Sequence, residues 1–142
     1  MPSLAAADAT VVVAALVSWH ERHRAAAAAI ESALARKALV LPAPVLIESY
    51  AILTRLPAEH RLPHPEALDL LRNTFAKVRT PGARNVWSFL RACSVNAVGG
   101  SGAYDAQIVA IAREAGAKTL YTFRREELER AAGGGVEVVE PV

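Results

Sequence analysis

Three carboxyl side chains, those of Asp8, Glu48 and Asp105, lie among apolar residues, where an unpaired charge is costly. Asp8 has alanine on both sides, and Glu48 shares a helical face with Val45 and Ile52. A buried carboxylate must gain a partner or shift its pKa. A shared divalent cation would be a partner for all three, because hard ions such as Mg²⁺ take oxygen ligands.

Each of these carboxylates also has a local explanation. Asp8 and Asp105 could each stabilise the start of a helix, where negative charge is favoured. Glu48 could pair with Arg55, which follows it on the same predicted helix. All three, however, fall at strand ends or early helical turns on one edge of the predicted sheet, where ligand sites of parallel sheets form. We therefore take Asp8, Glu48 and Asp105 as candidate metal ligands.

The elements that must position these residues are short strands alternating with helices. Strands are predicted at residues 4–8, 39–41, 118–122 and 136–139, with an edge strand at 77–79. Helices are predicted at residues 11–17 (with Thr10 as N-cap), 20–37, 45–56, 65–75, 83–95, 104–115 and 125–132. This alternation indicates an α/β fold, a three-layer α/β/α sandwich with a central, mainly parallel sheet.

Composition sets further limits on the class of protein. The chain has 142 residues, 53% of them hydrophobic, and a net charge of +2, which indicates one folded domain over residues 1–142 and excludes disorder. Cys93 is the only cysteine, so a disulfide scaffold and a cysteine-based zinc site are excluded. Uncharged runs fall short of the ~18 residues of a membrane span, and we expect a cytoplasmic protein without membrane contact.

Four segments together resemble the PIN domain, and more narrowly a VapC toxin of a bacterial VapBC toxin–antitoxin system. They are DATVVV (8–13), LIESYAILTRL (46–56), GAYDAQIVA (102–110) and LYTF (120–123). The resemblance covers nearly the whole chain and rests on the order and spacing of these segments. It implies the same α/β/α sandwich that the alternation of elements predicts.

The resemblance also implies an activity, a metal and a set of partners. It implies an endoribonuclease dependent on Mg²⁺, with Mn²⁺ as an alternative, that hydrolyses RNA with a metal-activated water. Asp8, Glu48 and Asp105 match the family's catalytic acidic ligands, and Thr10 and Thr122 match its hydroxyl positions. The implied partners are a homodimer mate and a VapB-like antitoxin that covers the acidic site.

One position departs from the family pattern. The family has Asp or Asn two residues after the threonine that Thr122 matches, and this chain has Arg124. A fourth acid is then absent or supplied by Glu126 or Glu127. The alternative function is a degenerate PIN domain that binds RNA or a protein partner without cleavage. The chain fits a receiver domain poorly because Asp8 lacks an acidic neighbour.

Several weaker signals remain. The chain lacks the G-x-G-x-x-G motif of a dinucleotide-binding module. Trp19 and Trp87 could stack on RNA bases. A place in the core or at a subunit interface is the favoured interpretation of both tryptophans.

Overall fold

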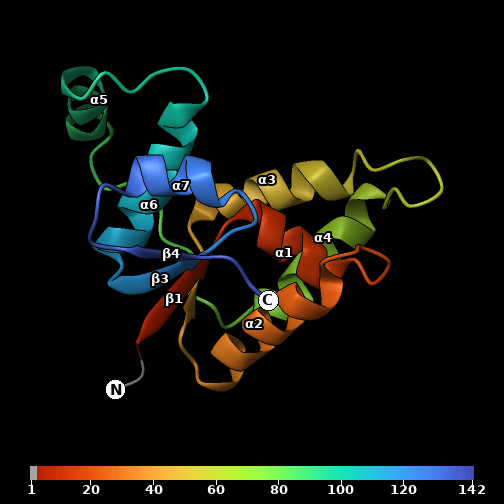
Figure 1. Cartoon of the computed structure of the whole chain (residues 1–142). Coiled ribbons are helices and arrows are strands. Elements are labelled where there is room, and N and C mark those ends of the chain that lie inside the picture. The colour runs from red at the N-terminus through yellow and green to blue at the C-terminus, as the bar shows by residue number, and fades with distance from the viewer. Residues whose placement is uncertain (1–2) are drawn as a thin grey trace.

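In the part of the chain that the structure describes, four parallel strands form the central sheet (Figure 1). A computed structural model describes residues 3–142 of the chain. The strand order is β2-β1-β3-β4, and the bounds are β1 Leu4–Ala7, β2 Leu39–Val40, β3 Ala117–Tyr121 and β4 Glu137–Val139. The strand expected at 77–79 is reduced to a single parallel bridge between Val40 and Arg79. Pro81, two residues beyond Arg79, has no N–H with which to extend that ladder.

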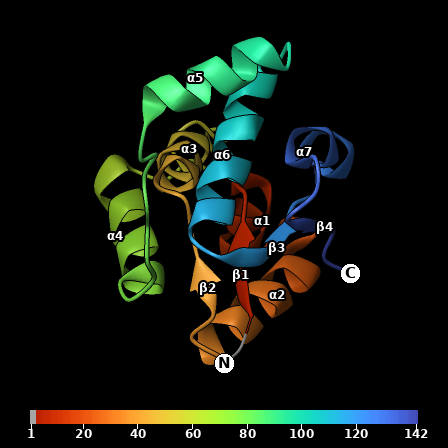
Figure 2. The same ribbon diagram turned by 90° about the vertical axis from the view of Figure 1, so that its left-hand side faces the viewer.

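Residues 3–142 also contain seven helices. Their bounds are α1 Ala9–Leu16, α2 His23–Ala35, α3 Ala43–Leu53, α4 His64–Phe75, α5 Val86–Val95, α6 Gly102–Glu114 and α7 Arg125–Ala132. The paired helices α1 and α2 lie on one side of the strands, and α6 lies on the other (Figure 2). The layers are therefore helix, sheet and helix, which confirms the α/β sandwich predicted from the sequence.

Strand β1 lies between both helical layers, and three of its four residues are alanines. Its residues Ala5, Ala6 and Ala7 are buried, as expected for a central parallel strand covered on both faces. The larger core side chains come from its neighbours, including the fully buried Val12 of α1 and Leu120 of β3. The core thus fixes the position of β1 and of the residue that follows it.

Helix α1 begins one residue after Asp8, and Asp8 is its N-cap. The Asp8 carboxylate accepts hydrogen bonds from the backbone N–H groups of Thr10 and Val11. The prediction that Thr10 caps this helix is therefore wrong. An aspartate at the N-cap satisfies the second and third N–H groups of the helix, which fits these two bonds.

Three of the strands end together at one edge of the sheet. The backbone N–H of Asp8 donates to the carbonyl of Tyr121 at 3.0 Å, and that of Thr122 donates to the carbonyl of Val139 at 3.1 Å. These bonds continue the parallel ladder just past the strands. Asp8 and Thr122 therefore leave the sheet side by side, at its carboxyl edge.

Helix α5 lies across the start of α6, away from the sheet (Figure 1, Figure 2). The buried residue of α5 is Cys93, whereas Trp87 is 78% exposed. Trp19 is 51% exposed and stacks on His60 with the ring centroids 4.2 Å apart. Neither tryptophan lies in the core, and of the two expected places a subunit interface stays a prediction. Within residues 3–142, no helix is long and apolar enough to cross a membrane.

Candidate active site at the carboxyl edge of the sheet

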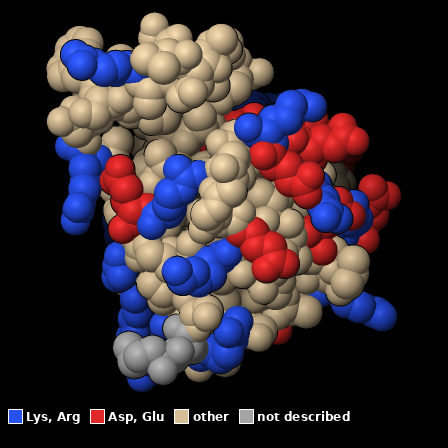
Figure 3. Space-filling view, turned by 60° about the vertical axis from the view of Figure 1, so that its left-hand side comes forward, with Lys and Arg blue, Asp and Glu red and all other residues tan. Residues whose placement is uncertain are grey.

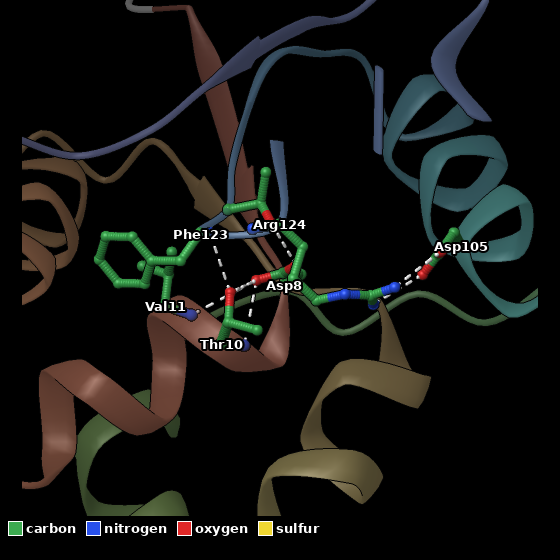
Figure 4. A network of polar contacts seen from close by, with 7 residues as sticks. Asp8, Thr10, Val11, Asp105, Phe123 and Arg124 are labelled. Carbon is green, nitrogen blue, oxygen red and sulfur yellow. Dashed lines mark hydrogen bonds and ion pairs between the residues drawn. The ribbon is translucent and has the colours of Figure 1, made fainter. Parts of the chain in front are cut away.

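Asp8 is held by hydrogen bonds to both of its carboxylate oxygens (Figure 4). Its Oδ1 accepts from the Thr10 backbone N–H at 3.0 Å, the Thr10 hydroxyl at 2.5 Å and the Val11 N–H at 3.3 Å. Its Oδ2 accepts from the Thr122 hydroxyl at 2.5 Å. Burial raises the pKa of Asp8, while these hydrogen bonds and the charge of Arg124 oppose the rise.

Thr122 connects this carboxylate to the segment that follows β3. The fully buried Thr122 hydroxyl donates to Asp8 and accepts from the backbone N–H of Arg124 at 2.8 Å. The Thr10 hydroxyl likewise accepts from the Phe123 N–H at 3.0 Å. Two threonine hydroxyls thus fix the end of β3 against the start of α1. Both are the hydroxyl residues that the sequence singled out.

Asp105 lies in the first turn of α6 and forms a two-pronged ion pair with Arg124 (Figure 4). Arg124 Nη1 donates to Asp105 Oδ1 at 3.0 Å, and Nη2 donates to Oδ2 at 3.1 Å. Burial alone would lower the pKa of Arg124. The hydrogen bond and charge of Asp105, with the charges of Glu127 and Asp8, raise it overall. The guanidinium therefore interacts electrostatically with all three of these carboxylates.

Glu48 does not lie with the buried residues of α3, and the prediction that it shares their face is wrong. The buried positions are Val45, Ser49 and Leu53, spaced four residues apart, and Glu48 lies outside this stripe and is exposed. Partial burial raises the pKa of Glu48, and the negative charges of Asp8 and Asp105 raise it further. Glu48 is therefore electrostatically coupled to both of the other predicted ligands.

A cleft of about 450 Å³ lies between α3 and α6, with Glu48 on one side and Asp105 and Arg124 on the other. A second hollow of about 300 Å³ shares Asp105 and Arg124 and is also lined by Glu127 and Arg130. Of the two candidates for a fourth acid, Glu127 lines this hollow, and Glu126 is exposed to solvent. The Arg124–Asp105 pair contributes to the wall of both spaces.

The donor types at this edge fit a hard divalent cation, because all three predicted ligands are carboxylates. Their positions are not yet those of ligands. Across residues 3–142, no three His, Cys, Asp or Glu side chains converge closely enough to hold a metal ion. Asp8 is bonded to hydroxyls, Asp105 to Arg124, and Glu48 faces the cleft. An ion at this edge would therefore require movement of side chains.

The sequence of this chain matches a known family and named relatives. The family model described as the PIN domain matches residues 5–134. The chain belongs to the PIN-domain family. It is 32% identical over 119 residues to Ribonuclease VapC40 of Mycobacterium tuberculosis, covering 81% of this chain and 83% of that protein. It is 31% identical over 109 residues to Ribonuclease VapC27 of the same species, covering 77% of each.

A solved structure shares the fold of this PIN domain. The crystal structure of PAE2754 from Pyrobaculum aerophilum superposes with a TM-score of 0.62 at 18% identity. The match covers 96% of this chain and 84% of that one. The likeness concerns the fold alone.

Sequence reasoning noted Arg124 only as a departure from the family pattern. It missed that the guanidinium contacts Asp105, because residues 105 and 124 meet only after β3 has paired with β1. A signal was nevertheless present. Arg124 stands where the family has an acid or amide beside the other acids. A positive side chain at that position is expected to pair with one of the remaining carboxylates.

Proposed function

We propose that this PIN domain, as a single domain over residues 1–142, is an endoribonuclease toxin dependent on Mg²⁺ or Mn²⁺. The observation that carries the proposal is the buried Asp8, oriented by Thr10 and Thr122 at the edge where Asp105 and Glu48 also lie. Relatives named Ribonuclease VapC40 and VapC27 support the activity. RNA is the proposed substrate class.

The roles of the residues follow from their contacts. Asp8, Glu48 and Asp105 would hold the cation, and the coupling that raises the pKa of Glu48 is the repulsion that such a cation would relieve. When bound, a divalent cation acidifies a water molecule and offsets the charge that develops on a phosphate. Thr10 and Thr122 keep Asp8 oriented, so this carboxylate needs no rearrangement of its own.

The proposed partners are a second copy of this chain and a VapB-like antitoxin, in the cytoplasm. An apolar surface supports the proposed pairing with a second copy of this chain. Figure 3 shows a projecting region almost free of charged side chains, where α5 lies. Exposed apolar residues of α5 are Val86, Trp87, Leu90 and Val95. An exposed apolar patch on this scale is typical of a protein interface. We place the antitoxin at the cleft beside Glu48, which also borders Asp105 and Arg124.

The test is cleavage of total cellular RNA by the purified, antitoxin-free protein in Mg²⁺ or Mn²⁺. Discrete cleavage that is lost with EDTA and in Asp105→Asn is the expected result. Because this substitution also leaves Arg124 without its partner, Glu48→Gln is tested in parallel. Cleavage that survives EDTA and both substitutions would overturn the metal-site proposal.

A second candidate function is binding without cleavage. The observation in its favour is the pairing of Arg124 with both oxygens of Asp105, one of the three proposed ligands. Folded protein that binds RNA or a partner but does not cleave in excess Mn²⁺ would favour this candidate. Gain of cleavage in Arg124→Asp would then identify the arginine as the cause.

A further inference from the structure

The Arg124 guanidinium is paired with the carboxylate of Asp105, one of the three proposed metal ligands. Its two terminal nitrogens lie 3.0 and 3.1 Å from the two oxygens of Asp105, a planar pairing that satisfies both acceptors at once. The Asp105 side chain is only 12% exposed, so solvent competes weakly for it. In this arrangement the positive charge beside Asp105 comes from the chain itself.

The contacts of Arg124 allow its head group to leave without disturbing the fold. Its backbone N–H is bonded to the buried Thr122 hydroxyl, which fixes the main chain at the start of α7. Its side chain is 41% exposed and borders both the α3–α6 cleft and the hollow beside Arg130. The guanidinium therefore has solvent-filled space beside it, whereas Asp105 stays fixed in the first turn of α6.

We propose that Arg124 and a divalent cation compete for the Asp105 carboxylate, so that the metal site is complete only when the guanidinium has moved away. This inference rests on the proposed metal-dependent function. A divalent cation cannot take the Asp105 lone pairs that the guanidinium already uses, and two positive charges beside one carboxylate repel each other. Arg124 thereby acts as an internal counter-ion that offsets the charge of Asp105 without metal and raises the metal concentration needed to fill the site.

The test measures binding of Mn²⁺ alone, by isothermal titration calorimetry, so that it does not depend on turnover. The variants are Arg124→Ala, Arg124→Lys and the matched control Arg130→Ala. Arg130 lines the same hollow and carries the same charge, without a hydrogen bond to Asp105. The expected result is Mn²⁺ binding roughly tenfold tighter in Arg124→Ala than in the wild type, a usual size for coupling between two binding events.

The other variants distinguish direct competition from simpler causes. Arg124→Lys keeps the charge and loses the two-pronged geometry, so it should bind Mn²⁺ with intermediate affinity. Arg130→Ala should bind like the wild type. Equal tightening in Arg130→Ala would overturn the inference, because long-range charge would then explain the effect. Weaker binding in Arg124→Ala would also overturn it, because Arg124 would then support the metal site.

The failure of this inference is separable from failure of the proposed function. Asp105→Asn is titrated with Mn²⁺ alongside the arginine variants. Equal Mn²⁺ affinity in the wild type and Arg124→Ala, with binding lost in Asp105→Asn, would overturn the competition and leave the metal site standing. Absence of Mn²⁺ binding in every folded variant would overturn the metal site and the inference together.

Discussion

The hydroxyl of Thr122 donates a hydrogen bond to Asp8 Oδ2 at 2.5 Å, although the two residues are 114 positions apart in the sequence. The bond is buried and joins the end of β3 to the N-cap of α1. The same hydroxyl oxygen accepts from the Arg124 N–H. One side chain therefore supports both the central carboxylate and the segment that carries the competing arginine.

Replacing Thr122 by valine should lower the free energy of unfolding by about 1–3 kcal/mol, because it leaves Asp8 Oδ2 and the Arg124 N–H buried without this partner. Urea unfolding followed by circular dichroism measures the change. Thr122→Ser is the matched control. It keeps the hydroxyl and loses one methyl group, which costs about 0.8 kcal/mol. A valine variant no less stable than the serine variant would contradict the role of the hydroxyl.

Replacing Glu48 by glutamine should weaken Mn²⁺ binding at least about tenfold and leave the free energy of unfolding within about 0.5 kcal/mol of the wild type. The physical reason is that Glu48 is exposed at the cleft, where it contributes charge but little packing. Calorimetric titration and urea unfolding measure the two quantities. Glu31→Gln, an exposed acid on α2, is the control and should change neither. Unchanged Mn²⁺ affinity in Glu48→Gln would exclude Glu48 as a ligand.

The stability of the metal-free protein should depend on pH through Asp8. Burial raises the pKa of Asp8 in the folded state above its ordinary value of 3.8. As pH rises above that value, the unfolded chain releases its proton first, so stability falls until the folded pKa is passed. Asp8→Asn does not titrate and keeps a side chain suited to an N-cap.

The unfolding free energy of Asp8→Asn minus that of the wild type should therefore increase as the pH rises above 3.8 and level off once the raised pKa of Asp8 is passed. Urea unfolding at several pH values, with EDTA present throughout, measures this difference. A difference that falls with pH would mean that the hydrogen bonds from Thr10 and Thr122 outweigh the cost of burial.

Replacing Trp87 by glutamate should convert a dimer of this protein into a monomer with the fold retained. Trp87 is 78% exposed on α5, within the apolar surface that we propose to be the interface. Size-exclusion chromatography with light scattering measures the mass. Leu68→Glu, an exposed apolar position on α4, is the control and should remain dimeric. A wild-type protein that is monomeric at high concentration would contradict the proposed dimer.

Local sequence patterns predicted most of the secondary structure. The alternation of short apolar runs with helical segments gave the parallel sheet, and α7 spans the predicted residues 125–132. Boundaries were less accurate. The expected helix at 83–95 begins later, at Val86, because the Asn85 side chain caps it through the Ser88 N–H at 3.0 Å. Caps depend on single side chains, whereas periodicity averages over many residues.

Residue type and spacing also predicted which acids gather at one edge, because parallel strands end together. The sequence by itself therefore determined the fold class and the placement of Asp8, Glu48 and Asp105 in one region, and both depend on periodicity or on order along the chain. Thr122 was singled out by the resemblance to the PIN domain.

Only the tertiary structure decided how these side chains are paired. Glu48 faces the cleft because the buried stripe of α3 runs through Val45 and Ser49, and Arg124 bonds Asp105 because β3 delivers it opposite the start of α6. Such contacts join residues far apart in sequence, and their geometry follows from how the helices pack on the sheet. A one-dimensional pattern carries no information on that packing, so the competing arginine becomes visible only in three dimensions.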